Sequence, residues 1–166
     1  MENRYIVMVG TAGAAAALEA AANRAEEVRN RFPGFFLKQG EMLSEQQKKL
    51  SGGVPIGFCA QFELNLSGKS ILMALWELGE ELDTGFEVVF DSIPLDQFTI
   101  EITELFGLNP YEEKTGEGRL LVLTDPERAL EELKKAGLAA AVIGKLTPGK
   151  ARTAVTAEGI RYLNSK

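Results

Sequence analysis

The chain alternates between short apolar segments and longer amphipathic ones along all of its 166 residues. Short apolar runs predict strands, whereas longer stretches with apolar residues three to four positions apart predict helices. The sequence contains no internal repeat, low-complexity tract or linker that would separate two domains. We therefore expect a single α+β domain over residues 1–166, built as a mixed sheet flanked by helices.

The expected elements follow from this alternation and from the turn residues between the segments. Strands are expected at Tyr5–Val9, Ile56–Leu66, Phe86–Phe90, Arg119–Leu123, Ala140–Leu146, Arg152–Thr156 and Ile160–Leu163. Helices are expected at Ala14–Phe32, Phe35–Leu50, Lys69–Leu82, Asp96–Phe106 and from Pro126 to Gly137. Gly40 lies inside the second of these helices and is expected to break it, because glycine is a poor helix former.

Charge and composition exclude several classes of protein. The formal net charge is −6, whereas a nucleic-acid-binding protein needs a basic face. No apolar run approaches the roughly 20 residues that span a bilayer, and the first residues lack the basic-then-apolar order of a signal peptide. Cys59 is the single cysteine, so it cannot form a disulfide within the chain. A cytoplasmic location is the expectation that remains.

The sequence contains no histidine. This excludes a Ser-His-Asp triad and a Cys-His dyad, and it removes the commonest zinc ligand. The acidic residues are scattered and form no pair beside a glycine turn, so we expect most of them on solvated helix faces. The pattern predicts neither a catalytic residue nor a metal site.

The best candidate for a ligand-binding segment is the turn Ser67-Gly68-Lys69-Ser70, which joins a predicted strand to a predicted helix. Such a turn directs backbone N–H groups to one point, where the helix dipole favours phosphate, sulfate or a nucleotide tail. In a second interpretation Ser67 or Ser70 caps the helix and Lys69 is exposed. A P-loop is excluded, because the Walker pattern needs a glycine five residues before Gly68, where this chain has Glu63.

Two further glycine-containing segments are candidates for the same role. The segment Gly10–Gly13 links a strand to a helix and is either a structural turn or a second ligand-binding segment. In the latter case Thr11 and Gly13 are expected beside the first turn, across the end of the sheet. The segment Lys114–Gly118 is predicted to be a hairpin or edge loop, because the Glu117 carboxylate would repel a phosphate.

Several segments resemble, in the same order, those of one known domain. They are the opening strand and glycine turn Tyr5–Gly13, the run Ala74–Leu78, the strand exit Asp91–Leu95, the helix end Glu101–Pro110, the strand Gly118–Val122 and the closing segment Lys134–Gly144. Together they resemble the C-terminal domain of the AIR synthase family. This superfamily of ATP-using enzymes includes purine-pathway synthetases, selenophosphate synthetase and the hydrogenase-maturation dehydratase. The resemblance implies an AIR synthase C-terminal-like α+β fold, with a partial likeness to ferredoxin-like plaits.

The candidate turn departs from the family pattern where the family usually reads like H-D-[VI]-T-[ED]-G-G. This chain has Leu64 for the histidine, Asn65 for the aspartate, and Lys69 and Ser70 for the paired glycines. The resembling segments span nearly the whole sequence and leave no room in it for the family's N-terminal domain. That domain carries most of the ATP and metal site, so the resemblance implies that the usual chemistry is altered here.

Two functional hypotheses follow from the resemblance. In the first, the chain is a stand-alone, non-catalytic module that binds a protein partner, itself or a small anion, with Asn65 and the Ser67–Ser70 turn at the ligand. In the second, it is the C-terminal half of a split or truncated ATP-dependent enzyme, and ATP is a cofactor only when a separate N-terminal domain chain supplies its site. Because family enzymes are dimers, we expect a homodimer with the alanine-rich helix Ala14–Ala22 or a sheet edge at the contact. Neither nucleic acid nor a membrane is an expected partner.

Overall fold

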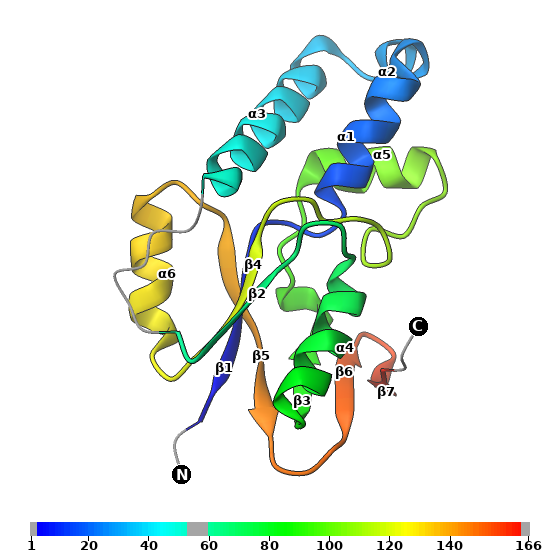
Figure 1. Ribbon diagram of the computed structural model, residues 1–166. Helices are drawn as coiled ribbons and strands as arrows, with labels where there is room; N and C mark the ends of the chain where they lie inside the picture. The colour runs from blue at the N-terminus through cyan, green and yellow to red at the C-terminus, as the bar shows by residue number, and fades with distance from the viewer. Residues whose placement is uncertain (1–2, 53–59, 164–166) are drawn as a thin grey trace.

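The computed structural model describes residues 3–52 and 60–163, and its strands form one mixed sheet in the order β2-β4-β1-β5-β3-β6-β7 (Figure 1). The strands are β1 (Tyr5–Val9), β2 (Phe62–Asn65), β3 (Gly85–Val89), β4 (Arg119–Leu123), β5 (Ala140–Thr147), β6 (Arg152–Thr156) and β7 (Gly159–Tyr162). Neighbouring strands are antiparallel, except that β3 and β6 run parallel. The predicted α+β class with a mixed sheet is confirmed.

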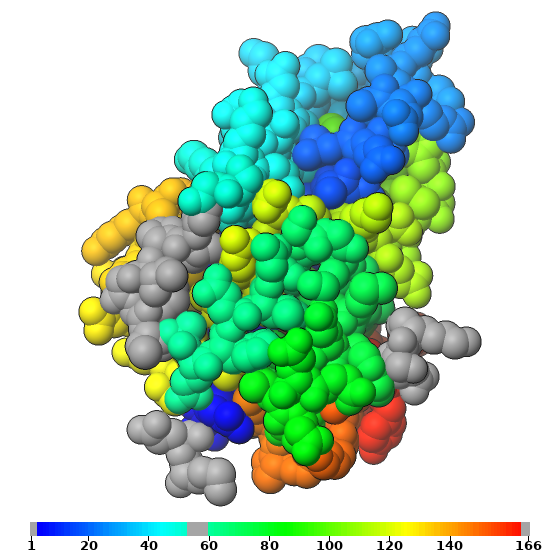
Figure 2. All heavy atoms as spheres, in the orientation of Figure 1, coloured from blue at the N-terminus to red at the C-terminus, as the bar shows by residue number. Residues whose placement is uncertain are grey.

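The helices lie on both faces of the sheet and beyond one of its ends. They are α1 (Ala14–Asn23), α2 (Ala25–Arg31), α3 (Gly34–Ser51), α4 (Ile71–Leu82), α5 (Gln97–Leu105) and α6 (Pro126–Lys135), with a short 3-10 helix η1 (Phe90–Ser92). Figure 1 shows α1, α2, α3 and α5 gathered above the sheet. In the space-filling view of the same side, α4 forms the green surface in front of the strands (Figure 2).

Alternating side chains of the strands build a core on each face. Ile6 and Met8 of β1 are fully buried in one cluster with Leu75 of α4. Their neighbours Val7 and Val9 point to the other face and join a second cluster, which includes residues of α6. The same alternation in β1 thus places α4 and α6 on opposite sides of the sheet.

A third cluster holds the helices beyond the end of the sheet together. Phe36 of α3 stacks on Phe98 of α5, with ring centroids 4.9 Å apart, and also on Phe32 at 4.1 Å. The alanines Ala14 and Ala17 of α1 are fully buried in this cluster. The alanine-rich half of α1 therefore packs against other helices of the same chain, as its small side chains allow.

Three predicted boundaries were wrong. The helix α3 continues through Gly40, because the Phe98 ring lies against this residue: a Cβ there would be 2.7 Å from a ring carbon. The helix predicted at Ala14–Phe32 is divided at Arg24, whose φ of −127° is not helical. This break turns α2 so that Val28 reaches the third cluster.

The strand predicted at Ile56–Leu66 can be compared with the structure over residues 60–66 only. Residues 56–59, including Cys59, lie outside the described residues, and β2 begins only at Phe62 and ends at Asn65. Among the described residues, no helix is long and apolar enough to cross a bilayer.

Candidate functional site

The two candidate turns leave the same end of the sheet. Both β1 and β2 pair antiparallel with β4, which lies between them, so they run in the same direction. Val9, the last residue of β1, and Asn65, the last of β2, both lie opposite Arg119 of β4. The predicted proximity of the Gly10–Gly13 turn to the Ser67–Ser70 turn therefore has a basis in the strand order.

Asn65 shapes the first turn through its side chain. Its Oδ1 accepts a hydrogen bond of 2.8 Å from the backbone N–H of Ser67, and the N–H of Lys69 donates to the Leu66 carbonyl at 3.0 Å. Gly68 has a φ of 78°, a left-handed conformation that suits glycine. An amide at residue 65 thus stabilises a tight turn between β2 and α4.

The side chain of Lys69 is bound within the chain. Its Nζ lies 3.3 Å from Oε2 of Glu77 on α4 and donates a 3.1 Å hydrogen bond to the Asn65 carbonyl. The Lys69 side chain is only 26% exposed, so it is more confined than the capping interpretation expected. The Glu77 carboxylate offsets the positive charge that would attract an anion.

Ser70 is the N-cap of α4. Its Oγ accepts a 3.1 Å hydrogen bond from the Met73 N–H, and its backbone is extended, as is usual at this position. Of the two serines that could have capped the helix, the structure uses Ser70, whereas Ser67 contributes its backbone N–H to the turn.

The Gly10–Gly13 turn is packed closely against neighbouring backbone. Gly13 has a φ of 67°, and a Cβ there would lie 2.8 Å from the Pro110 carbonyl oxygen. The Ala12 N–H donates to the Pro94 carbonyl at 2.9 Å, and the Gly10 N–H donates to Ala139 at 2.8 Å. Thr11 is 8% exposed, and its hydroxyl has no hydrogen-bond partner among the described residues.

The segment Lys114–Gly118 connects the two turns, and its prediction as a hairpin or edge loop was wrong. It leads into β4, which is an interior strand with β1 and β2 on its two sides. The Thr115 N–H donates to the Lys69 carbonyl at 3.0 Å, and the Thr115 carbonyl accepts from Ala15 at 3.2 Å. The loop is thus hydrogen-bonded both to the start of α4 and to the start of α1. This position could not be predicted without the strand order.

Two partners of the candidate site were missed by sequence reasoning. Glu77 is the first acidic residue of α4, and its position after six apolar residues was the available signal. Gln47 of α3 accepts a 2.8 Å hydrogen bond from the Glu117 N–H, so it fixes the connecting loop from above. No local pattern predicts that contact, because 70 residues separate the pair.

The described hollows lie away from the Ser67–Ser70 turn. One, of about 250 Å³, lies on the sheet and is lined by residues that include Tyr5, Glu87 and Lys145. Another, of about 340 Å³, lies beside α1 and is lined by residues that include Glu19 and Lys114. Among the residues that the structure describes, no group of three or more His, Cys, Asp or Glu side chains could hold a metal ion.

The sequence matches no known family profile and no curated protein. Solved structures, in contrast, share the fold. E. coli HypE aligns with a TM-score of 0.73 at 16% identity, over 100% of this chain and 51% of that one. A chain of the HypE–HypF complex gives 0.68 at 18% identity, over 99% of this chain and 53% of that one. Thiamine-monophosphate kinase from Stenotrophomonas maltophilia gives 0.67 at 17% identity, over 93% of this chain and 50% of that one.

These neighbours are AIR synthase-like proteins, and the likeness extends over the sheet and its helices. The chain has the AIR synthase C-terminal-like fold, as the sequence resemblance implied. It spans about half the length of the solved structures that it matches.

Proposed function

We propose that this chain is a non-catalytic module with the AIR synthase C-terminal-like fold, and that it works by binding a protein partner. The observation that carries this proposal is the internal pairing of the candidate turn. The side chains of Asn65, Lys69 and Ser70 all bond to groups of the chain itself. A ligand would have to displace these bonds before it could use the same groups.

The charges around the turn support the same proposal. Phosphoryl transfer depends on cations that are placed to stabilise negative charge on the phosphates. Two cations at this end of the sheet are Lys69, paired with Glu77 at 3.3 Å, and Arg119, paired with Glu63 at 3.2 Å. Each carboxylate lowers the positive potential that a nucleotide would need.

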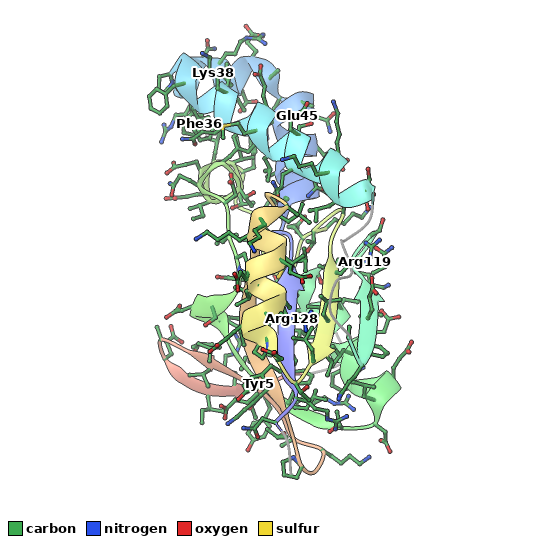
Figure 3. The ribbon with its side chains drawn as sticks, turned by 90° about the vertical axis from the view of Figure 1, so that its left-hand side faces the viewer. Tyr5, Phe36, Lys38, Glu45, Arg119 and Arg128 are labelled. Carbon is green, nitrogen blue, oxygen red and sulfur yellow. The ribbon has the colours of Figure 1, made fainter. Side chains whose placement is uncertain are left out.

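Incubation with ATP, magnesium and substrates of the family enzymes tests the non-catalytic proposal. We expect no ATP turnover above the rate in buffer, measured as released phosphate. Turnover that is abolished by Asn65→Ala or Lys69→Ala would contradict the proposal. A matched control is Lys38→Ala, because Lys38 lies on the distant helix α3 (Figure 3).

A small anion is the second ligand that the module could take at the Ser67–Ser70 turn. The space in front of the turn favours this, since a Cβ on Gly68 would meet no atom within 4 Å. Thermal-shift and calorimetric titrations with phosphate, AMP and ATP are the test, and salt should weaken any binding. If one of them binds, replacing Lys69 and Ser70 together by alanine should reduce its affinity; unchanged affinity would place the ligand elsewhere.

A second candidate function is that of one half of a split ATP-dependent enzyme. The match to about half of each solved structure favours it, because these 166 residues align with only one half of those chains. ATP would then be a cofactor only in the presence of a separate ATP-binding domain chain. Co-purification with such a chain, and ATP turnover by the mixture alone, would favour this function over the non-catalytic one. A gene for an isolated ATP-binding domain beside this one would be the first indication.

Partner binding has a precedent on this fold, since one of the matched structures is a complex of HypE with HypF. We place the module in the cytoplasm, where its lone Cys59 would remain reduced. We also propose that it self-associates through a face of its sheet.

A further inference from the structure

Among the residues that the structure describes, an α-helix covers one half of the sheet on only one side. Phe86 and Val88 of β3 and Ala154 of β6 are fully buried on the side of α4. Because successive side chains of a strand alternate, the intervening residues point away from α4. We call this opposite side of β3, β6 and β7, together with its neighbour on β5, the open face. Its side chains include Glu87, Val89, Lys145, Thr153, Val155, Ile160 and Tyr162.

Part of the open face is apolar and accessible. Val89 is 37% exposed, Ile160 65% and Tyr162 70%, and none of them belongs to the three hydrophobic clusters of the described residues. The helix on this side, α6, packs on the neighbouring half of the sheet instead, and Figure 3 shows it in front of the strands above Tyr5. A hollow of about 250 Å³ lies beside the open face and is lined in part by Val89 and Val142. Contiguous apolar surface of this kind marks an interface.

The charges of the open face are balanced and adjacent. Glu87 of β3 lies directly opposite Lys145 of β5 in the strand register. Neither side chain is in an ion pair within the described part of the chain. Such a surface can complement its own copy. When a two-fold axis passes between the two groups, the positive group of each copy faces the negative group of the other.

We infer that the open face is the contact between two copies of this chain, which pack sheet on sheet with Glu87 of each copy against Lys145 of the other. Sheets packed in this way lie about 10 Å apart with their apolar side chains interdigitated. The alternative contact on α1 is disfavoured, since Ala14 and Ala17 are already buried against the chain's own helices. This inference rests on the proposed partner-binding function and names the partner as a second copy.

Charge reversal tests the inference through the symmetry of the contact. Wild type should sediment at twice the monomer mass of 18.1 kDa at high micromolar concentration. Glu87→Lys places two lysines of each copy against two of the other, and Lys145→Glu does the same with carboxylates. Each change should weaken dimerisation at least about tenfold. When the two variants are mixed, their charges complement each other, so native mass spectrometry should show the mixed dimer in preference to either parent.

Replacing exposed apolar residues by arginine distinguishes the open face from other exposed surfaces. Val89→Arg should give a folded monomer, whereas Met42→Arg, at a 71% exposed methionine of α3, should leave the dimer intact. Circular dichroism and thermal unfolding check that each variant is folded. A wild type that stays monomeric at high micromolar concentration, or a dimer that Met42→Arg disrupts and Val89→Arg does not, overturns the inference. Such results leave the proposed non-catalytic function standing, since ATP turnover tests that function separately.

Discussion

The guanidinium of Arg152 occupies the space in which residue 79 would carry a side chain. A Cβ on Gly79 would lie 2.6 Å from Nε of Arg152. Arg152 is 9% exposed, lies over the Trp76 ring at 4.6 Å from its centroid, and donates hydrogen bonds to the Thr84 carbonyl and to Glu80 at 3.1 and 2.9 Å. One buried cation thus ties α4, the start of β3 and β6 together.

Gly79→Ala should destabilise the protein, although alanine is the better helix former by about 1 kcal/mol. The new methyl group must displace Arg152, which is held by two hydrogen bonds and by Trp76. Overpacking of this kind costs about 1–3 kcal/mol, so we expect a net loss in the free energy of unfolding measured in urea. Gly34→Ala is the control, because a Cβ there meets nothing within 4 Å. A net gain in stability for Gly79→Ala would show that the Arg152 guanidinium can move aside at little cost.

The relation between residues 79 and 152 illustrates what the sequence could predict. Periodicity located α4, and the apolar alternation located β6, yet no local pattern indicates that an arginine crosses from one to the other. The same holds for Gly40, which stays helical because the Phe98 ring fills its side. Both contacts join residues far apart in the sequence, whereas propensity is a local quantity that tertiary packing overrides.

At the candidate site, the local features were the predictable ones. A serine before an apolar helix is a typical N-cap, and Ser70 has that role. The pairing of Lys69 with Glu77 and the bridge from Thr115 depend on how the turn is oriented on the sheet. That orientation follows from the strand order β2-β4-β1, which sequence reasoning did not provide.

The capping role of Ser70 predicts unequal effects at the two serines of the turn. Ser70→Ala removes the acceptor of the Met73 N–H and should cost about 1 kcal/mol of stability. Ser67→Ala should be nearly neutral, because Ser67 takes part through its backbone N–H, which alanine retains. Chemical denaturation of both variants is the measurement. Equal costs at the two residues would count against a purely local capping role.

The side chain of Gln46 fixes α3 to the segment that leads into β5. Its Nε2 donates to the Gly137 carbonyl at 3.0 Å, and its Oε1 accepts from the Ala139 N–H at 2.9 Å. Gln46→Ala removes both bonds and should lower the free energy of unfolding by about 1–3 kcal/mol. Glu45→Ala changes the adjacent exposed residue (Figure 3) and should have little effect. Hydrogen exchange should also become faster at Ala139; protection that is unchanged there would contradict the assignment.

The ion pair between Asp83 and Lys150 should make the stability of the protein depend on pH. A hydrogen bond from Lys150, together with its charge, holds the pKa of the Asp83 carboxyl below its ordinary value of 3.8. Because the folded-state pKa is the lower one, this contact stabilises the protein above the unfolded-state value and is lost as pH falls through the folded-state value. Asp83→Asn should therefore melt at a lower temperature than wild type at pH 7.

The gap between the two melting temperatures should begin to close as the pH falls below about 4, where the unfolded chain takes up a proton at residue 83, and it should be lost as the pH falls through the lower folded-state pKa. Asparagine suits the comparison, since Asp83 ends α4 in a left-handed conformation with a φ of 49°, which asparagine tolerates. Lys150→Met should reproduce the effect. Glu81→Gln, at an exposed carboxylate with no ion pair in the described part of the chain, should not. The exposed pair is screened by ions, so salt should narrow the gap at pH 7 as well. A gap of the same size at pH 3 and pH 7 would mean that Asp83 acts through its backbone conformation alone.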